Sequence, residues 1–171
     1  MPISISLDPA DRDIDAIHRI LAGTYWSSCI RREVVDEAFR NSIAVVAIDA
    51  ATGQTVGGAG LVTDCATSAW RCDVIVIETH RGRGIAHRMI EELECQPSLQ
   101  TVRRWALATR DAQKLYEDFG SQKVAHGSTW MEKPRERMLA NRYGLIAIAV
   151  LGEDDGHSLS ADSRLRRQGP G

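Results

Sequence analysis

The chain has 171 residues, of which 43% are hydrophobic and 26% charged, and its formal net charge is −2. This length favours one domain with a sizeable hydrophobic core. The small net charge gives no global basic field for nucleic acid or a membrane surface, so any anion-binding site must be local. No apolar run reaches the roughly 18 residues that span a bilayer, and the first residues do not form a signal-peptide pattern. We therefore expect a cytoplasmic protein that binds neither nucleic acid nor membranes.

The cysteines predict neither a disulfide framework nor a metal site. No two of them form a CxxC pair, and no histidine lies at metal-ligand spacing from them. We expect free thiols in a reducing compartment and no bound metal. The four residues are Cys29, Cys65, Cys72 and Cys95.

The first residues predict a strand followed by a helix. Residues 3–7 alternate in polarity like a short strand. Asp8-Pro9 then supplies an N-cap residue and a proline at the first helical position, and Gly23 marks the end of the helix. The apolar residues Ile14, Ile17 and Leu21 have helical spacing.

A second amphipathic helix is predicted over about residues 31–40. The loop between the two helices, residues 24–30, contains the adjacent aromatic residues Tyr25 and Trp26. The apolar side of the second helix is formed by Val34, Val35, Ala38 and Phe39.

Three apolar runs then predict an antiparallel meander. Residues 43–49 form a nearly continuous apolar strand, which is followed by a turn around Gly53. Residues 55–63 form a glycine-rich strand, to which a neighbouring backbone or a ligand can come close. Residues 69–77 form the third strand, after a polar turn near Thr67.

The pattern changes to alternating helices and strands in the next part of the chain. A helix with an apolar stripe ends at Pro97, and residues 103–109 form a strand. Asp111 can cap a further helix that Gly120 closes. The stripe of the first of these helices consists of Ile85, Ala86, Met89, Ile90 and Leu93. The predicted elements end with two short strands, residues 123–125 and 128–132.

These elements predict a single α/β domain, residues 1–133, in which helices flank a mixed, mostly antiparallel central sheet. Residues 134–151 form an extension with an apolar segment, residues 143–151, that would pack on the domain or on the partner chain of a homodimer. Residues 152–171 offer little to bury, and we expect them to be disordered.

A glycine-rich turn, residues 81–84, joins the strand that ends at Ile77 to the following helix. Its glycines let a backbone approach a ligand, and a helix N-terminus favours a negative charge, so the turn can hold a phosphate. The P-loop pattern fails because the chain contains no Gly-Lys, and the dinucleotide pattern fails because position 87 is His. A turn that only joins the strand to the helix would leave Arg81 and Arg83 without a purpose.

The sequence RGRGIA, with the form Arg81-x-x-Gly84-x-Ala86, resembles the acetyl-CoA-binding turn of the GNAT superfamily of N-acetyltransferases. A second similarity is a strand followed by a helix with the pattern Tyr116-x-x-x-Gly120. The resemblance covers about residues 3–133 and implies a GNAT-like fold. The family often has an aromatic residue after that glycine, where this chain has a serine, which puts the packing of the last strands in question.

The resemblance implies acetyl-CoA as co-substrate and assigns residues to it. The backbone of Val76 and Ile77 would align the pantetheine arm like an added strand, and the N–H groups of the turn would hold the pyrophosphate. The residues so implied are Val76, Ile77, Arg81, Gly82, Arg83, Gly84, Ile85, Ala86, Thr109 and Ala112.

The resemblance also suggests catalytic and acceptor-binding residues. Tyr116 corresponds to the general acid of the family, although it could instead be a core aromatic residue. Asp73 is the best-placed general base, with Asp64 and Glu78 as rivals, and each of them could also be a turn or surface charge. The acceptor site is expected to involve Tyr25, Trp26 and Asp64, although the two aromatic residues could also be peripheral core.

The sequence thus predicts an N-acetyltransferase that moves acetyl directly from acetyl-CoA to the amine of a small molecule or peptide. Two other interpretations stay open. The chain could be a non-catalytic acyl-CoA-binding or sensing module, or a subunit whose residues 143–151 mainly serve assembly.

Overall fold

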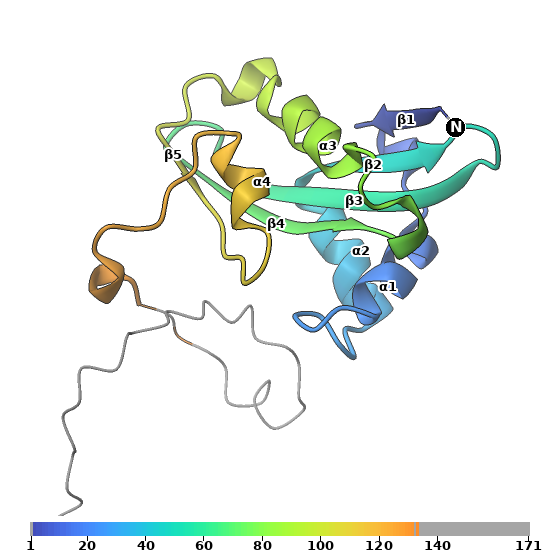
Figure 1. The fold of residues 1–171 in the computed structure, drawn as a ribbon, viewed down its shortest axis with the longest axis horizontal. Coiled ribbons are helices and arrows are strands. Elements are labelled where there is room, and N and C mark those ends of the chain that lie inside the picture. Colours follow the sequence, from blue (N-terminus) through green and yellow to red (C-terminus); the bar gives the residue numbers. More distant parts are fainter. Residues whose placement is uncertain (1, 132, 134–171) are drawn as a thin grey trace, which may run out of the picture.

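The computed structural model describes residues 2–131 and 133, which form one five-stranded sheet with helices on both faces (Figure 1). Strands β1 to β4 pair with their neighbours in antiparallel orientation, and β5 pairs with β4 in parallel. The prediction of a mixed, mostly antiparallel sheet is therefore confirmed. In spatial order the strands are β1 (Ile3–Ser6), β2 (Ile43–Asp49), β3 (Gln54–Thr63), β4 (Ser68–Val76) and β5 (Arg104–Ala106).

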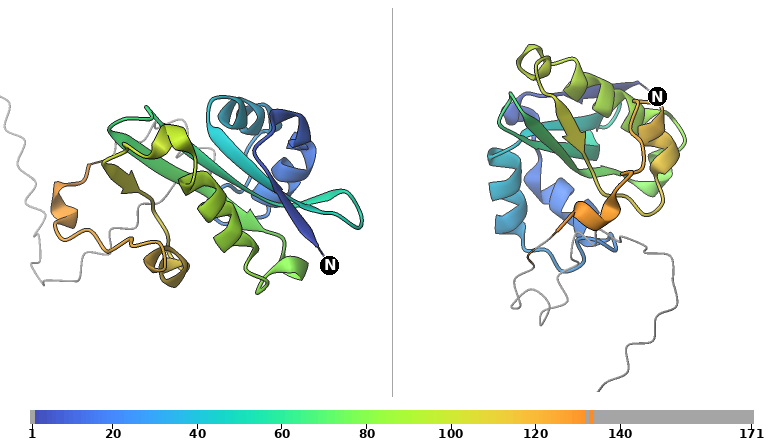
Figure 2. Two further views of the ribbon diagram at one scale, coloured as in Figure 1. Left: turned by 90° about the horizontal axis from the view of Figure 1, so that it is seen from above. Right: turned by 90° about the vertical axis from the view of Figure 1, so that its left-hand side faces the viewer.

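Helices α1 (Ile14–Ala22) and α2 (Arg32–Arg40) cover one face of the sheet, and α3 (Ile85–Glu94) covers the other (Figure 2). The short helix α4 (Gln113–Glu117) follows β5. Four 3-10 turns complete the described elements: η1 (Pro9–Asp11), η2 (Glu78–His80), η3 (Pro97–Leu99) and η4 (Gly127–Thr129). None of the helices in this part of the chain combines the length and apolarity needed to cross a membrane.

Alternation along β2 distributes its side chains between two hydrophobic cores. Val45 and Ala47 belong to the core under α3, whereas Ala44 and Val46 belong to the core under α1 and α2. All four are fully buried. Because helices cover both faces of the sheet at β2, side chains on both sides of this strand are buried. This explains the nearly continuous apolar run over residues 43–49.

The predicted start of the first helix is wrong. Asp8 accepts a hydrogen bond from the Ala10 N–H (2.8 Å), but it caps only the turn η1. The cap of α1 is Asp13, whose carboxylate accepts from the Ala16 N–H at 2.9 Å. The apolar side of α2 is also narrower than predicted, since Val35 and Phe39 are buried while Val34 and Ala38 are exposed.

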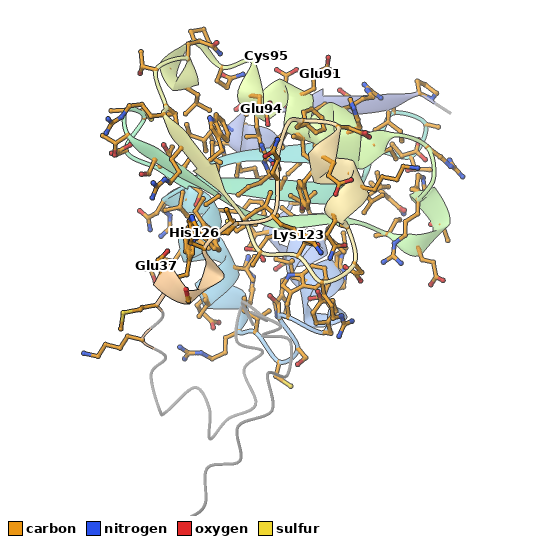
Figure 3. The ribbon with its side chains drawn as sticks, turned by 60° about the vertical axis from the view of Figure 1, so that its left-hand side comes forward. Glu37, Glu91, Glu94, Cys95, Lys123 and His126 are labelled. Carbon is orange, nitrogen blue, oxygen red and sulfur yellow. The ribbon has the colours of Figure 1, made fainter. Side chains whose placement is uncertain are left out.

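The predictions for the last described part need three corrections. β5 is shorter than the predicted residues 103–109, and the strands predicted at 123–125 and 128–132 are not formed among residues 121–131, where the turn η4 lies instead. This segment contains Lys123 and His126 (Figure 3). Its only aromatic contact on the sheet is Trp130 against Trp70, with ring centroids 6.4 Å apart. The predictions for residues 134–151 and 152–171 lie outside the described residues.

Candidate active site

β4 contains a bulge where it pairs with β3. Gly58 of β3 lies opposite Ile75, and Gly60 lies opposite Cys72, so two residues of β4 face one residue of β3. Asp73, inside this bulge, has a positive φ of 54°. A bulge of this kind bends a strand and redirects its side chains.

The outer edge of β4 is open beyond the bulge. β5 pairs only with Ser68 to Trp70, so the rest of β4 has no strand beside it on that side among the described residues. At the far end, the Ile77 N–H donates to the Val56 carbonyl of β3 (2.9 Å). Because backbone groups alternate sides in an antiparallel ladder, those of Val76 point to the open edge, while the Ile77 N–H is already used. The backbone groups at this open edge could hydrogen-bond to an extended ligand that carries amides, such as a pantetheine arm, in the manner of an added strand.

The glycine turn that follows, residues 81–84, is exposed. Gly82 and Gly84 have φ values of 71° and 70°, and no atom lies within 4 Å of the position of an added Cβ at either residue. Gly84 is the N-cap of α3, and the first helical hydrogen bond is from the Arg88 N–H to the Gly84 carbonyl (3.1 Å). Among the described residues, no acceptor pairs with the N–H groups of residues 82–86. The donors, the helix dipole and the open space fit a pyrophosphate.

The two arginines of this turn are tied to its backbone. Arg81 Nε donates to the Val76 carbonyl at 3.0 Å, and Arg83 Nη2 donates to the Thr79 carbonyl at 3.0 Å. Both side chains are exposed and add positive charge beside the free N–H groups. Ile85 is buried under the turn and anchors it to the core, and Ala86 is half-buried.

Tyr116 of α4 is buried, with 8% of its surface exposed. Burial raises the pKa of its phenol, and Asp111, Cys72 and Tyr25 raise it further, whereas Arg71 lowers it. Because its pKa is raised, the phenol is protonated at neutral pH and can donate a proton.

Asp73 lies where the bulge brings it to the loop between α1 and α2. Burial raises the pKa of its carboxyl group, and a hydrogen bond from the Trp26 side chain opposes part of this shift. Trp26 in turn makes an edge contact with Tyr25, with ring centroids 4.9 Å apart. The Arg110 guanidinium lies 3.6 Å from the centroid of the Tyr25 ring. The structure thus brings Asp73 together with both aromatic residues of the loop.

The two rival carboxylates have different surroundings. Asp64 accepts hydrogen bonds from the N–H groups of Ala66, Thr67 and Ser68 and from the Thr67 hydroxyl, all within the β3–β4 turn. These bonds, that of the Thr67 hydroxyl first, hold its pKa well below its usual range. This structural role accounts for Asp64 and gives no support to its predicted contact with the acceptor. Glu78 is exposed on η2.

The residues before α4 organise its N-terminus. The Thr109 hydroxyl accepts a hydrogen bond from the Ala112 N–H (3.0 Å), and Ala112 is the N-cap position. The predicted cap, Asp111, makes no such bond. Just after α4, Phe119 contacts His87 of α3, with ring centroids 4.4 Å apart.

Sequence reasoning missed a buried ion pair beside Tyr116. Arg71 of β4 is 4% exposed and pairs with Glu94 of α3. Its guanidinium carbon lies 5.5 Å from the centroid of the Tyr116 ring and 5.4 Å from that of Trp105. The available signal was an arginine within a mostly apolar strand.

The site offers neither a cluster of metal ligands among the described residues nor an activated thiol. Within the described residues, no group of three or more His, Cys, Asp or Glu side chains could hold a metal ion. Cys72 is adjacent to Asp73, and burial raises the pKa of its thiol to about 12. A thiol with so high a pKa is a poor nucleophile at neutral pH.

Comparison with known proteins identifies the family. The sequence profile of the acetyltransferase (GNAT) domain matches residues 25–121. No functionally curated protein matches the chain significantly. A solved structure from Xanthomonas campestris pv. campestris, assigned to the GNAT acetyltransferase family, is similar with a TM-score of 0.74 and 32% identity. The similarity covers 86% of this chain and 99% of that chain.

More distant structures share the fold. Glucosamine-6-phosphate N-acetyltransferase from Arabidopsis thaliana has a TM-score of 0.57 at 16% identity, over 78% of this chain and 99% of that chain. Diaminobutyrate acetyltransferase from Paenibacillus lautus, in complex with L-2,4-diaminobutyric acid and coenzyme A, has a TM-score of 0.58 at 16% identity. That similarity covers 69% of this chain and 74% of that chain. Since the GNAT profile covers more than half of the chain and the Xanthomonas protein is 32% identical over 86% of it, this chain belongs to the GNAT family and is an acetyltransferase.

Proposed function

We propose that this chain transfers acetyl from acetyl-CoA directly to the amine of a small molecule or peptide. One observation carries the proposal. Asp73 and Tyr116, a carboxyl group and a phenol with raised pKa values, lie near the open edge of β4 that leads to the glycine turn. A base and an acid beside an acyl-CoA-binding edge are the groups that aminolysis of a thioester requires.

The co-substrate would be held by backbone rather than by side chains. The free N–H groups of residues 82–86 and the exposed Arg81 and Arg83 suit the pyrophosphate. The open edge at Val76 suits the amides of the pantetheine arm, and Arg81 would release the Val76 carbonyl for it. Thr109 and Ala112 would act by shaping the start of α4. Ile77 would only support this edge, since its N–H donates to the Val56 carbonyl (2.9 Å) and its carbonyl accepts from the His80 N–H (3.0 Å).

In the proposed reaction Asp73 takes a proton from the ammonium group of the acceptor, directly or through water. The resulting amine attacks the thioester carbonyl and forms the C–N bond; the attacking nitrogen then gives its second proton to water, and the C–S bond breaks. Tyr116 gives its proton to the departing thiolate, and its phenolate regains through water the proton that the nitrogen released, so that the products are the amide, the CoA thiol and the one proton held by Asp73. The raised pKa of Asp73 makes it a stronger base than an ordinary carboxylate, which suits this role.

The surroundings favour direct transfer over an acetyl-cysteine relay. Cys72 is the cysteine adjacent to Asp73, and the pKa of its thiol, about 12, keeps it protonated. Its Sγ also packs tightly on β3, since an added Cβ at Gly60 would lie 3.2 Å from it.

The acceptor would approach from the side of the α1–α2 loop. Trp26 contacts Asp73 there, and Tyr25 is 43% exposed beneath Arg110. An aromatic surface next to a carboxylate suits a cationic amine. The similar fold of enzymes that act on glucosamine 6-phosphate and diaminobutyrate favours a small molecule over a peptide. We place the reaction in the cytoplasm, where acetyl-CoA is available.

The test is release of the CoA thiol from acetyl-CoA across a panel of amines, with mass-spectrometric identification of the acetylated product. The proposal predicts thiol release that depends on one class of amine and falls by about 10²- to 10⁴-fold in Asp73→Asn. Tight CoA binding without turnover for any amine would instead support the non-catalytic acyl-CoA-binding alternative.

A further inference from the structure

Arg71 is a buried charge in an apolar setting. Its side chain is 2% exposed, and its neighbours along the same face of β4 are the core residues Ala69 and Val74. Nη2 pairs with Oε1 of Glu94, a residue near the end of α3 (Figure 3). Nε and Nη1 have no hydrogen-bond partner among the described residues. A buried cation with unpaired donors destabilises a fold relative to an apolar residue of the same size, so its presence calls for a function.

The guanidinium joins four elements at the point where β4 and β5 separate. It lies between the rings of Trp105 on β5 and Tyr116 on α4, at 5.4 and 5.5 Å from their centroids, and it is paired to α3 through Glu94. Cations at this distance from an aromatic ring are attracted by its π electrons. Arg71 therefore orients the Tyr116 ring relative to the strand that carries Asp73.

Among the groups that shift the pKa of Tyr116, Arg71 is the one that lowers it. Asp111 faces the phenol from the segment before α4, Cys72 from β4 and Tyr25 from the α1–α2 loop, and each of them disfavours a phenolate. Burial acts in the same direction and is the largest effect. The positive charge of Arg71 opposes these effects because it favours the phenolate. The negative charge of Glu94, which is paired with Arg71, offsets part of that positive charge.

We propose that Arg71 is a positioning residue of the acetyl transfer, which holds the Tyr116 ring and stabilises the phenolate left when Tyr116 gives its proton to the thiolate. This inference rests on the proposed function. In that step the O–H bond of Tyr116 breaks, the S–H bond of CoA forms, and the electron pair stays on the phenolate, whose ring the Arg71 guanidinium overlies. Without the cation, a buried phenol would be too weak an acid for the step.

The first readout measures ionisation and does not depend on activity. A fluorotyrosine, which is more acidic than tyrosine, is placed at position 116 and titrated by fluorine NMR in three backgrounds. Arg71→Met should raise the pKa of this phenol by about one unit or more, because an opposite charge at this distance has an effect of that size. Arg71→Lys should give a smaller rise, and Glu94→Gln should lower the pKa, because it leaves the charge of Arg71 uncompensated. An unchanged pKa in both Arg71→Met and Glu94→Gln would overturn the inference.

The second readout is the pH dependence of kcat. In Glu94→Gln, the decrease of kcat at alkaline pH, where Tyr116 loses its proton, should begin at a lower pH. In Arg71→Met, kcat should fall several-fold while KM for acetyl-CoA stays unchanged. A purely structural role would lower stability without moving this alkaline decrease. If Arg71→Met does not fold, Glu94→Gln still tests the inference, since its expected shift has the opposite sign.

The outcomes separate the inference from the proposed function. If Tyr116→Phe abolishes turnover but the fluorine titration is insensitive to both substitutions, only the role of Arg71 is refuted. If the titration shifts as expected but Tyr116→Phe retains full turnover, the acid role of Tyr116 is refuted, and the inference is refuted with it.

Discussion

Gly84 determines whether backbone N–H groups can contact a phosphate at the start of α3. Its φ of 70° favours glycine, and the position of its missing Cβ is open. We predict that Gly84→Glu abolishes CoA binding, because both a side chain and a negative charge would enter the pyrophosphate site. Isothermal titration calorimetry with CoA measures this directly.

Gly53 provides the matched control for that substitution. It has a φ of 71° and equally open surroundings, but it lies in the turn between β2 and β3. Gly53→Glu introduces the same backbone strain, roughly 1–2 kcal/mol, outside the glycine turn of residues 81–84. It should keep wild-type affinity for CoA. Wild-type affinity in a folded Gly84→Glu protein would refute the assignment of the glycine turn as the pyrophosphate site.

Asp73 and Asp64 have pKa shifts of opposite sign, and this predicts opposite phenotypes. Because the folded-state pKa of Asp73 is raised, its ionised form destabilises the fold at neutral pH. Asp73→Asn should therefore raise Tm at neutral pH, with the gain vanishing as pH falls below the pKa of an unfolded carboxyl group. If Asp73 is the base, turnover should fall by about 10²- to 10⁴-fold.

Asp64→Asn should do the reverse. The folded-state pKa of Asp64 is lowered, so its ionised form stabilises the β3–β4 turn above the unfolded pKa, and the benefit is lost as pH falls through the folded pKa. The variant should melt at a lower temperature at pH 7 and keep its turnover. Thermal melts across pH, with one amine-acetylation assay, test both variants. An Asp64→Asn protein with lost turnover and unchanged Tm would reverse the two assignments.

The sequence predicted the residues of the site that lie in local motifs and missed those that depend on long-range packing. The glycine turn could be predicted because its glycines, arginines and helix start are contiguous. The contact between Trp26 and Asp73 could not, because it depends on a bulge that nothing in the sequence around Asp73 marks. Arg71 was missed because its partners Glu94 and Tyr116 come from two other elements.

At the scale of the elements, the close approach of β3 and β4 depends on Gly57. An added Cβ there would lie 2.7 Å from the Ile75 carbonyl oxygen, which is backbone and cannot rotate away. We predict that Gly57→Ala destabilises the fold by about 1–3 kcal/mol, because β4 must shift. Denaturant unfolding measures the loss, and acetyl-CoA affinity should weaken as well, since β4 ends in the proposed binding edge.

Gly23→Ala is the control for this prediction. Gly23 ends α1 with a φ of −84°, and its added Cβ would make only an ordinary contact of 3.5 Å. This change should be neutral or slightly stabilising. Equal unfolding free energies for the two alanine variants would show that β3 and β4 can separate freely.

Elements with a long apolar pattern were predicted well, and short or irregular ones were not. The strands β2, β3 and β4 and the helix α3 lie within a few residues of their predicted bounds, because burial on one or both faces leaves a periodic pattern. The start of α1 was wrong because two aspartates compete as caps, and only packing selects Asp13. The strands expected after Gly120 are absent from the described residues, as the serine that replaces an aromatic residue there had suggested.

At the scale of the whole molecule, we propose that residues 1–133 form the complete acetyltransferase domain. A chain truncated after Lys133 should unfold cooperatively and bind CoA like the full chain, and removal of residues 152–171 should leave Tm unchanged. If residues 143–151 join two copies, sedimentation should show a dimer for chain 1–151 and a monomer for chain 1–133. A Tm lowered by several degrees on loss of residues 152–171 would contradict the expected disorder of that segment.

The most direct test of direct acetyl transfer at this site is the turnover of Tyr116→Phe. The substitution keeps the ring that contacts Arg71 and removes only the hydroxyl, so acetyl-CoA affinity should stay unchanged. If the hydroxyl protonates the departing thiolate, kcat and kcat/KM should fall together by about 10²-fold, near the lower end for general acid catalysis, because water can partly replace it. A folded Tyr116→Phe protein with turnover within about twofold of wild type would contradict the account and leave Tyr116 as a packing residue.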